Sequence, residues 1–278
     1  MKKNMIKKIG LTAVLILSGT ELVMAENPVS PAAVQTANVA KSKVTMDIVQ
    51  LIDIAGRQRM LSQRIAKDYM YIGKKIAVSK ASKELTQSLE EMKTAQKKLV
   101  DSINDPDIQN LLAFVQMSSE DFEATSKEPF SIDNAQLILD LSESMLEGSQ
   151  YVVTSLKKLA NVKASKIVDM AGRQRMLAQR IAKYYIAYQA GIRDKNTVDQ
   201  MKAAVKLFAD SNEILMKNEN NTPEINRKLN KINRLWKIVY KFYLNIEKGG
   251  LPLIVFNTTD DITKQMNDIT GLYVELYK

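Results

Sequence analysis

An 18-residue segment occurs twice in this chain. Residues 52–69 read IDIAGRQRMLSQRIAKDY and residues 168–185 read VDMAGRQRMLAQRIAKYY, with 14 of the 18 positions identical. Packing of helices needs only apolar residues at about the right spacing, so it gives no reason to keep glycine, glutamine and three arginines in the same order. Because the retained residues are polar, the repeat indicates a duplicated unit with a role in binding.

The first 25 residues have the parts of a secretory signal peptide. Four lysines precede an apolar run over residues 9–17, and the stretch ending at Ala25 forms a cleavage site. The run is shorter than the roughly 20 residues that span a bilayer, so an uncleaved anchor is the lesser alternative. We expect cleavage near Ala25, a flexible leader over residues 26–39, and a mature protein in the periplasm.

The chain contains no cysteine and no histidine. Their absence excludes a disulfide framework, a thiol nucleophile, a histidine general base and the ordinary kinds of zinc site. The sequence also has no glycine-rich phosphate loop, no nucleophile elbow and no motif of clustered acids. We therefore expect no enzymatic activity, no cofactor and no metal ion.

The net charge of the chain limits the classes of molecule that it is expected to bind. The formal net charge of +9 falls to +6 once four lysines and Glu21 leave with the signal peptide. This excess is moderate and lacks the basic, aromatic-interleaved pattern of a nucleic-acid surface, so we expect anions or acidic surfaces instead. No later stretch is apolar enough for a second membrane crossing, and a signal would need a membrane-bound partner protein.

Apolar residues recur at helical spacing almost throughout the mature chain. Ten glycines and six prolines in 278 residues are too few for an all-β domain. The predicted fold class is all-α, with helices near residues 40–77, 80–104, 107–126, 132–160, 163–191, 195–218, 223–247 and 258–277. Pro106 and Pro223 lie 117 residues apart and the repeats lie 116 apart, so the duplication extends beyond the repeat. We expect two tandem antiparallel bundles of the four-helix type, at residues 40–160 and 161–278.

The junction of the two halves leaves two arrangements open. Residues 131–191 hold no proline, so one long helix could run through the junction and stack the bundles end to end. Alternatively, the chain turns near residues 161–163. The bundles then lie side by side, and the two repeated helices are free to face each other.

On a helical projection the repeated helix has a core face and a polar stripe. The core face holds Ile54, Leu61 and Ile65 in the first copy, and Met170, Leu177 and Ile181 in the second. The polar stripe carries Gly56, Arg59, Gln63 and Lys67, matched by Gly172, Arg175, Gln179 and Lys183.

A third face of the repeated helix carries arginines that have an acid nearby. Asp53 precedes Arg57 by four residues, and Asp68 follows Arg64 by four. Because side chains four residues apart are neighbours on a helix, this spacing predicts an ion pair for each of the two arginines.

Arg59 and Arg175 have no acid three or four residues away on their own helices. If the two stripes meet, within one chain or across a homodimer, these like charges repel unless something negative lies between them. A small planar oxyanion fits, since each guanidinium offers a donor fork suited to two oxygens. The alternatives are that both arginines reach solvent or pair with acids on other helices. The predicted ligand-binding residues are Gly56, Arg59, Gln63, Gly172, Arg175 and Gln179, with Arg57, Arg64, Lys67, Arg173, Arg180 and Lys183 as secondary candidates.

The string AGRQRMLSQR at residues 55–64, nearly unchanged at residues 171–180, resembles the hallmark of the PilJ-type sensory domain. That domain is found in type IV pili methyl-accepting chemotaxis transducers and is similar to the periplasmic domain of nitrate/nitrite sensor histidine kinases. The resemblance implies periplasmic helical bundles, and in the nitrate sensors one anion sits between the paired first helices of a dimer. By position, the arginine that grips nitrate matches Arg59 and Arg175, and the glycine beside the ligand matches Gly56 and Gly172.

The sensor-kinase version of the motif differs between the glycine and the arginine and just after the arginine. Those relatives are also membrane-anchored and continue into signalling modules, so the resemblance supports binding more strongly than signalling. We expect a non-enzymatic periplasmic protein that binds a small oxyanion, nitrate or nitrite first, and reports to a membrane-bound partner. The alternative is a structural or adaptor protein of the periplasm that uses the repeated helices for contact with other proteins.

Overall fold

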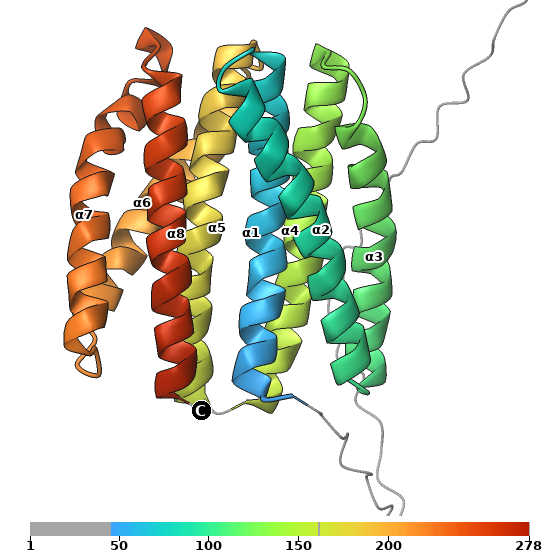
Figure 1. Cartoon of the computed structure of the whole chain (residues 1–278), viewed down its shortest axis with the longest axis vertical. Coiled ribbons are helices and arrows are strands. Elements are labelled where there is room, and N and C mark those ends of the chain that lie inside the picture. Colours follow the sequence, from blue (N-terminus) through green and yellow to red (C-terminus); the bar gives the residue numbers. More distant parts are fainter. Residues whose placement is uncertain (1–45, 161, 278) are drawn as a thin grey trace, which may run out of the picture. The chain divides into compact units, whose positions relative to one another are not determined.

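The computed structural model describes residues 46–160 and 162–277, and every regular element among them is a helix (Figure 1). The all-α class predicted from the sequence is therefore confirmed. None of the described helices is long and apolar enough to pass through a lipid bilayer. The predicted signal peptide and leader lie outside the described residues. The elements are α1 (Ile48–Gly73), α2 (Val78–Ser102), α3 (Pro106–Ser126), α4 (Ile132–Leu159), α5 (Val162–Ala190), α6 (Lys195–Met216), α7 (Pro223–Leu244), the short 3-10 helix η1 (Ile246–Lys248) and α8 (Pro252–Leu276).

The two halves begin corresponding helices in the same way. The N–H of Ile108 donates to the side chain of Asp105 at 3.0 Å at the start of α3, and the N–H of Ile225 donates to Thr222 at 3.2 Å at the start of α7. A proline follows each capping residue at the first helical position, where a missing N–H costs nothing. The duplication therefore includes the signals that start these helices.

Two helix starts differ from the predicted ones. α1 begins at Ile48 because Asp47 caps it and accepts a hydrogen bond from Val49 N–H at 2.7 Å, whereas the predicted helix already covers residues 46 and 47. α8 begins at Pro252 rather than at residue 258, since Gly249 with a φ of 67° completes the preceding turn and proline suits the first helical position. Residues 40–45 of the predicted first helix lie outside the described residues.

The two halves meet side by side through their repeated helices. α4 ends at Leu159 and α5 begins at Val162, so these are two helices and not one continuous helix. α1 and α5 share the most extensive helix–helix interface of the described structure. Figure 1 shows them adjacent at the centre, with α2–α4 on one side and α6–α8 on the other. The described residues form one compact unit, and a domain boundary near residue 160 stays a prediction.

The repeated helices are buried on nearly all sides. α1 packs mainly against α2, α4 and α5, and α5 packs mainly against α1, α6 and α8. Leu61 and Leu177 of the predicted core face are fully buried, whereas Ile54 and Met170 at its margin are half-buried. The predicted polar stripe is buried as well, so its charged side chains need partners inside the protein.

Truncation of a central leucine tests how tightly these helices pack. We expect Leu61→Ala to lower the free energy of unfolding by about 2–5 kcal/mol, because the side chain is fully buried and its loss leaves a cavity. Leu159→Ala, at a position 52% exposed, should change it by about 0.5 kcal/mol or less. Denaturant unfolding followed by circular dichroism measures both values, and similar losses in the two variants would contradict the packing described.

Candidate functional site

The seam between α1 and α5 brings together the two arginines that lack an acid on their own helices. A Cβ atom built on Gly56 would lie 3.0 Å from Nη2 of Arg59 and 3.7 Å from Nη2 of Arg175. A Cβ atom built on Gly172 would lie 3.2 Å from Nη2 of Arg175 and 3.8 Å from Nη2 of Arg59. The two glycines therefore leave the space that the two guanidinium groups fill, and these groups converge within a single chain.

Arg59 is held from two helices. Its Nη2 donates to Oδ1 of Asp169 in α5 at 2.8 Å, and its Nη1 donates to Oε1 of Gln150 in α4 at 2.6 Å. The side chains of Arg59 and Asp169 are 0% and 3% exposed. This buried ion pair therefore links the first half of the chain to the second.

Arg175 makes the equivalent contacts from the other repeated helix. Its Nη2 donates to Oδ1 of Asp53 in α1 at 2.5 Å, and its Nη1 donates to Oδ1 of Asn267 in α8 at 2.9 Å. Asp53 and Asp169 lie 116 residues apart, and Gln150 and Asn267 lie 117 apart, as the duplication requires. The two arginine–aspartate pairs, called the crossed pairs below, thus span the seam in opposite directions.

The crossed pairs correct the ion pairing predicted from spacing. The predicted pair of Asp53 with Arg57 is wrong, because Asp53 receives Arg175 from the opposite helix. Arg57 donates instead to Glu91 of α2 at 2.8 Å. Of the alternatives left open for Arg59 and Arg175, the structure shows pairing with acids on other helices.

Asp169 has more positive charge around it than one arginine supplies. Lys157 Nζ lies 2.8 Å from its Oδ2, and Arg173 Nη2 lies 3.3 Å from the same oxygen. Burial alone would raise the pKa of Asp169, but the charge of Arg59 and the hydrogen bond from Lys157 lower it below its ordinary value. Around the seam the four cations Arg59, Lys157, Arg173 and Arg175 therefore face two aspartates.

Each central arginine also has one donor without a partner. The Nε atoms of Arg59 and Arg175 are buried, and within the described structure neither donates a hydrogen bond. An unsatisfied donor of a charged group is costly inside a protein. Together with the excess of cations, these donors leave hydrogen-bonding capacity in the seam that the described residues do not satisfy.

The glutamines of the predicted site contact other helices. Gln63 Nε2 donates to the backbone oxygen of Ser142 in α4 at 2.9 Å, and Gln179 Nε2 donates to the hydroxyl of Thr263 in α8 at 2.8 Å. The predicted residues that the seam does gather in one place are Gly56, Arg59, Gly172 and Arg175.

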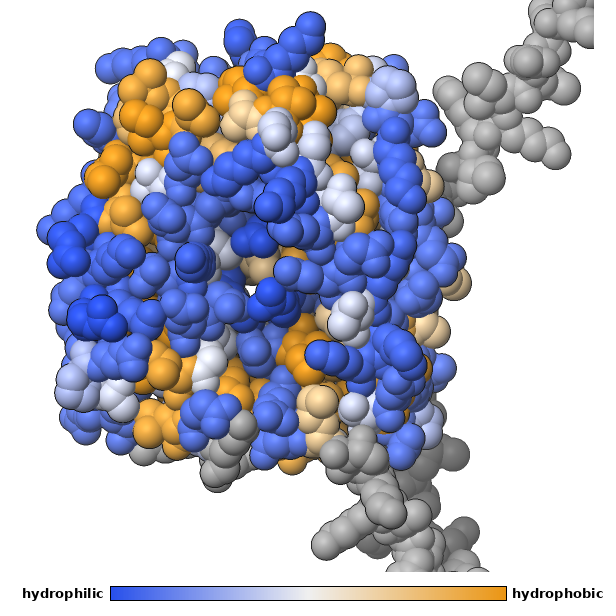
Figure 2. All heavy atoms as spheres, in the orientation of Figure 1, coloured by the Kyte–Doolittle hydropathy of each residue, from blue (hydrophilic) through white to orange (hydrophobic). Residues whose placement is uncertain are grey.

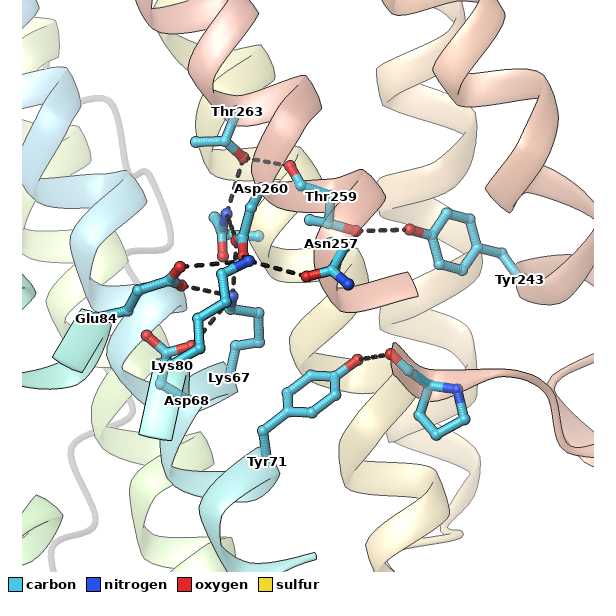
Figure 3. A network of polar contacts seen from close by, with 12 residues as sticks. Lys67, Asp68, Tyr71, Lys80, Glu84, Tyr243, Asn257, Thr259, Asp260 and Thr263 are labelled. Atoms are coloured by element: carbon cyan, nitrogen blue, oxygen red, sulfur yellow. Dashed lines mark hydrogen bonds and ion pairs between the residues drawn. The ribbon is translucent and has the colours of Figure 1, made fainter. Parts of the chain in front are cut away.

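Lys67, a secondary candidate, belongs to a separate buried ion cluster. Its Nζ lies 2.8 Å from Oδ1 of Asp260 in α8 and 3.4 Å from Oε2 of Glu84 in α2. Figure 3 shows these three side chains meeting between their helices, with Lys80 reaching the same two acids. The first half of the chain is therefore tied to α8 of the second half through Lys67.

A second cluster repeats this arrangement around α5. Lys183 Nζ and Arg180 Nη2 each lie 2.5 Å from a carboxylate oxygen of Glu143 in α4. Glu143 and Asp260 stand 117 residues apart, so each motif lysine pairs with the corresponding acid of the other half. Burial lowers the pKa of Lys183 to about 8, although Glu143 opposes the shift.

The first cluster also contains a fully buried acid, Asp68. Lys67 Nζ lies 3.0 Å from its Oδ1, yet neither carboxyl oxygen accepts a hydrogen bond within the described structure. Burial raises the pKa of Asp68 to about 7, and the nearby Glu84 and Asp260 add to the increase while Lys67 opposes it. The predicted pair of Asp68 with Arg64 is replaced by this contact with Lys67.

Comparison with known proteins identifies the family. The model of the PilJ family, described as the N-terminal domain of type IV pili methyl-accepting chemotaxis transducers, matches residues 49–118 and 160–249, more than half of the chain. The chain belongs to the PilJ family. No curated protein and no solved structure matches it.

The two matched segments show how the PilJ unit is used in this chain. Each segment contains one copy of the repeat, which confirms the resemblance and the two tandem copies inferred from the sequence. The crossed pairs therefore join one PilJ copy to the other. The family name assigns the chain to the sensory domains of chemotaxis transducers.

The partners of the two central arginines, Arg59 and Arg175, were not among the residues predicted from the PilJ repeats. A usable signal was present for the aspartates, because both copies keep an aspartate six residues before the arginine, as Asp53 and Asp169. Gln150 and Asn267 lie outside the repeat and correspond only when the offset of 117 residues is applied to the last helix of each half. Their contacts depend on how α4 and α8 are rotated, which periodicity does not fix.

The two crossed pairs differ in exposure, so their loss should have unequal effects. Asp169→Asn should lower the free energy of unfolding by about 3–5 kcal/mol, because Arg59 would remain buried without a charged partner. Asp53→Asn should cost less, about 2 kcal/mol, because water reaches Asp53, which is 26% exposed, and partly screens the charge that fully buried Arg175 then carries without an acidic partner. Urea unfolding at neutral pH compares the two variants, and an equal or reversed order would contradict the pairing.

The raised pKa of Asp68 predicts how the free energy of unfolding of this PilJ protein depends on pH. Its pKa rises from 3.8 to about 7 on folding, so between these values the folded state keeps a proton that the unfolded state has lost. The contribution of Asp68 is therefore most favourable at low pH and declines as the pH rises toward 7. Asp68→Asn should raise the free energy of unfolding by on the order of 2 kcal/mol near pH 8 and change it little near pH 4.

Thermal and denaturant unfolding at both pH values measure this difference, with Asp261→Asn, at an exposed position of α8, as the control. A gain of equal size at the two pH values would contradict the shifted pKa of Asp68.

Proposed function

We propose that this chain is a sensory protein that binds a small oxyanion, nitrate or nitrite first, between Arg59 and Arg175. The observation that carries the proposal is the convergence of two fully buried guanidinium groups on one glycine-lined space. A guanidinium fork matches two oxygens of a planar anion, and burial strengthens such a contact. Membership of a family of chemotaxis-transducer sensory domains supports a sensing role.

The anion would compete with aspartates that already hold the arginine forks. Asp53 and Asp169 each occupy Nη2 of one central arginine, so the ligand exchanges for carboxylates rather than filling an empty cavity. This exchange is electrostatically feasible. Asp169 keeps the charge of Lys157 when it releases Arg59, and Asp53, which is 26% exposed, can turn to water.

Asp53 is also the member of the crossed pairs that lies nearest to two surface grooves. It lines two surface grooves, one together with Arg57 and Glu91, the other together with Met46 and Gln50. Arg57, which is paired with Glu91, and the exposed Lys98 both line the first groove, so positive charge lies beside it. An anion would therefore approach along α1 and meet Arg175 first.

Replacement of the two aspartates by the anion would change how α1 and α5 are connected. In the crossed pairs each aspartate ties its own helix to the arginine of the other helix. An anion held by both arginines ties the arginines together and releases the aspartates, so the two helices favour a different relative position. A ligand that binds one position more tightly shifts the population toward it. We assign the protein to the periplasm as a non-enzymatic receptor that passes this shift to a membrane-bound partner.

Isothermal titration of the purified protein with nitrate, nitrite, sulfate and phosphate tests the site. We expect nitrate or nitrite to bind, and Arg59→Lys combined with Arg175→Lys to weaken binding about tenfold or more, because lysine keeps the charge but lacks the fork. Arg227→Lys, at a position 74% exposed on α7, is the matched control and should bind like wild type. Absence of binding by wild type, or equal binding by the double variant, would remove the proposal.

A variant without the competing carboxylate should shift the affinity in the opposite direction. Asp53→Asn should bind the anion several-fold more tightly, because no charged oxygen then holds the fork of Arg175. Asp133→Asn, at an exposed position of α4, should leave the affinity unchanged. Weaker binding by Asp53→Asn would show that this carboxylate supports the ligand and does not compete with it.

A second function is favoured by the neutralisation of both central arginines inside the fold. A seam that is complete without a ligand fits a structural or adaptor protein of the periplasm, whose helices contact other proteins. Under this alternative none of the four anions binds. A protein partner captured equally by wild type and by the Arg59→Lys, Arg175→Lys variant would then favour the adaptor.

A further inference from the structure

The outermost helices of the two halves carry opposite charges. α3 and α7 begin at equivalent prolines, Pro106 and Pro223, which are 117 residues apart. α3 holds four acidic residues and no basic one, whereas α7 holds six basic residues and one acidic. Figure 1 shows these helices at opposite edges of the described bundle. Duplication and divergence have therefore produced one acidic and one basic edge from the same element.

The basic residues of α7 form a stripe that faces solvent. Arg227, Lys231, Arg234, Ile238 and Lys241 recur at spacings of four and three residues, which places all five on one side of the helix. The opposite side of α7 is its buried side, and all five stripe residues are exposed. Figure 2 shows hydrophilic side chains over the middle of this edge and apolar ones toward its upper end. We call these five residues the basic stripe.

The cations of the basic stripe are largely without acidic partners. Within residues 46–160 and 162–277, Arg227 lies 3.6 Å from Glu224, while Lys231, Arg234 and Lys241 form no ion pair. Ile238 is 47% exposed in the middle of the stripe. The stripe therefore presents free positive charge around an apolar centre.

α3 presents the complementary surface. Phe114, Met117, Glu120 and Asp121 share its exposed side, and we call these four residues the acidic face. Phe114 is 48% and Met117 65% exposed. Across the described chain, Glu120 and Asp121 form no ion pair. The acidic face thus offers free negative charge beside an apolar pair.

We propose that the acidic face of one copy of this chain docks on the basic stripe of a second copy. Opposite charge on equivalent helices supplies the recognition, and Phe114 and Met117 against Ile238 supply apolar contact. The partner is a second copy because the chain itself carries both surfaces. This inference does not rest on the proposed anion site, which lies in the central seam.

The geometry makes the association open-ended. Because the two surfaces lie at opposite edges of the bundle, docking one pair leaves an acidic face free at one end and a basic stripe free at the other. A contact between two different surfaces that does not close into a ring adds further copies in a row. We therefore expect short head-to-tail chains whose length grows with protein concentration.

The contact should be weak and sensitive to salt. One helix face docking on another gives an interface at or below the lower end of the standard size, about 1,200 Å² in total, so the association is transient. Most of its specificity comes from exposed charges, which salt screens over about 10 Å at 0.1 M. Sedimentation velocity over a wide concentration range should show larger species at low salt and monomers at high salt.

Two charge-reversal variants test the proposal, because each should lose association alone and regain it when the two are mixed. Glu120→Lys with Asp121→Lys reverses both charges of the acidic face, and Lys231→Glu with Arg234→Glu reverses two of the four charges of the basic stripe. Each double variant alone should associate at least about tenfold more weakly than wild type, because like charges then meet at the contact. An equimolar mixture of the two should regain association, since the reversed acidic face of one variant meets the reversed stripe of the other, and the two unchanged surfaces can also meet. Lys158→Glu with Lys264→Glu, at exposed positions of α4 and α8, matches the change in net charge of the Lys231→Glu, Arg234→Glu variant and should behave as wild type.

Association that is lost in each double variant and restored in their mixture supports docking of one copy on another. The proposal fails if wild type stays monomeric at low salt, if either reversal associates like wild type, if the mixture remains monomeric, or if the control loses association equally. Binding of the basic stripe to vesicles of anionic lipid, with no self-association in solution, would also overturn it and assign the stripe to a membrane surface.

Discussion

Two arginine side chains buried in the same seam need negative charge between them, and this requirement organises the whole structure. Arg59 and Arg175 approach from opposite helices into a space that Gly56 and Gly172 leave open. The fold supplies the charge through an aspartate of the opposite helix, so each pair that removes repulsion also fixes the register of α1 against α5. A shift of one helix along the other would break both pairs together.

Duplication explains why this seam forms within one chain. Related halves reproduce the geometry of a two-fold dimer, and every partner of Arg59 has an equivalent at Arg175. A duplicated chain, unlike a homodimer, can change its two halves separately. Asp68 in the first copy corresponds to Tyr184 in the second, and acidic α3 corresponds to basic α7. The shifted pKa and the opposite edges both arise where the copies differ.

Sequence patterns are sufficient to locate the helices but not to predict which side chains pair between them. Periodicity and proline breaks located eight helices, because both depend on neighbours in the sequence. The core face was recognised correctly at Leu61 and Leu177, but the polar stripe proved to be buried, since α1 and α5 have neighbours on nearly all sides. The i, i+4 rule assigned Asp53 to Arg57 because it describes one isolated helix and ignores a competing arginine from another. The PilJ resemblance comes from the repeated polar string, whose residues follow one another in the sequence, so it can be recognised without knowing their tertiary contacts.

A double-mutant cycle between Arg59 and Asp169 tests the crossed seam most directly. Arg59→Met, Asp169→Asn and their combination are compared by urea unfolding, with a parallel cycle of Arg59 with Asp53 as the reference. The crossed arrangement predicts a coupling free energy of about 1 kcal/mol or more between Arg59 and Asp169, and a smaller one between Arg59 and Asp53, which interact only through Arg175. Coupling of Arg59 to Asp53 with none to Asp169 would contradict the account.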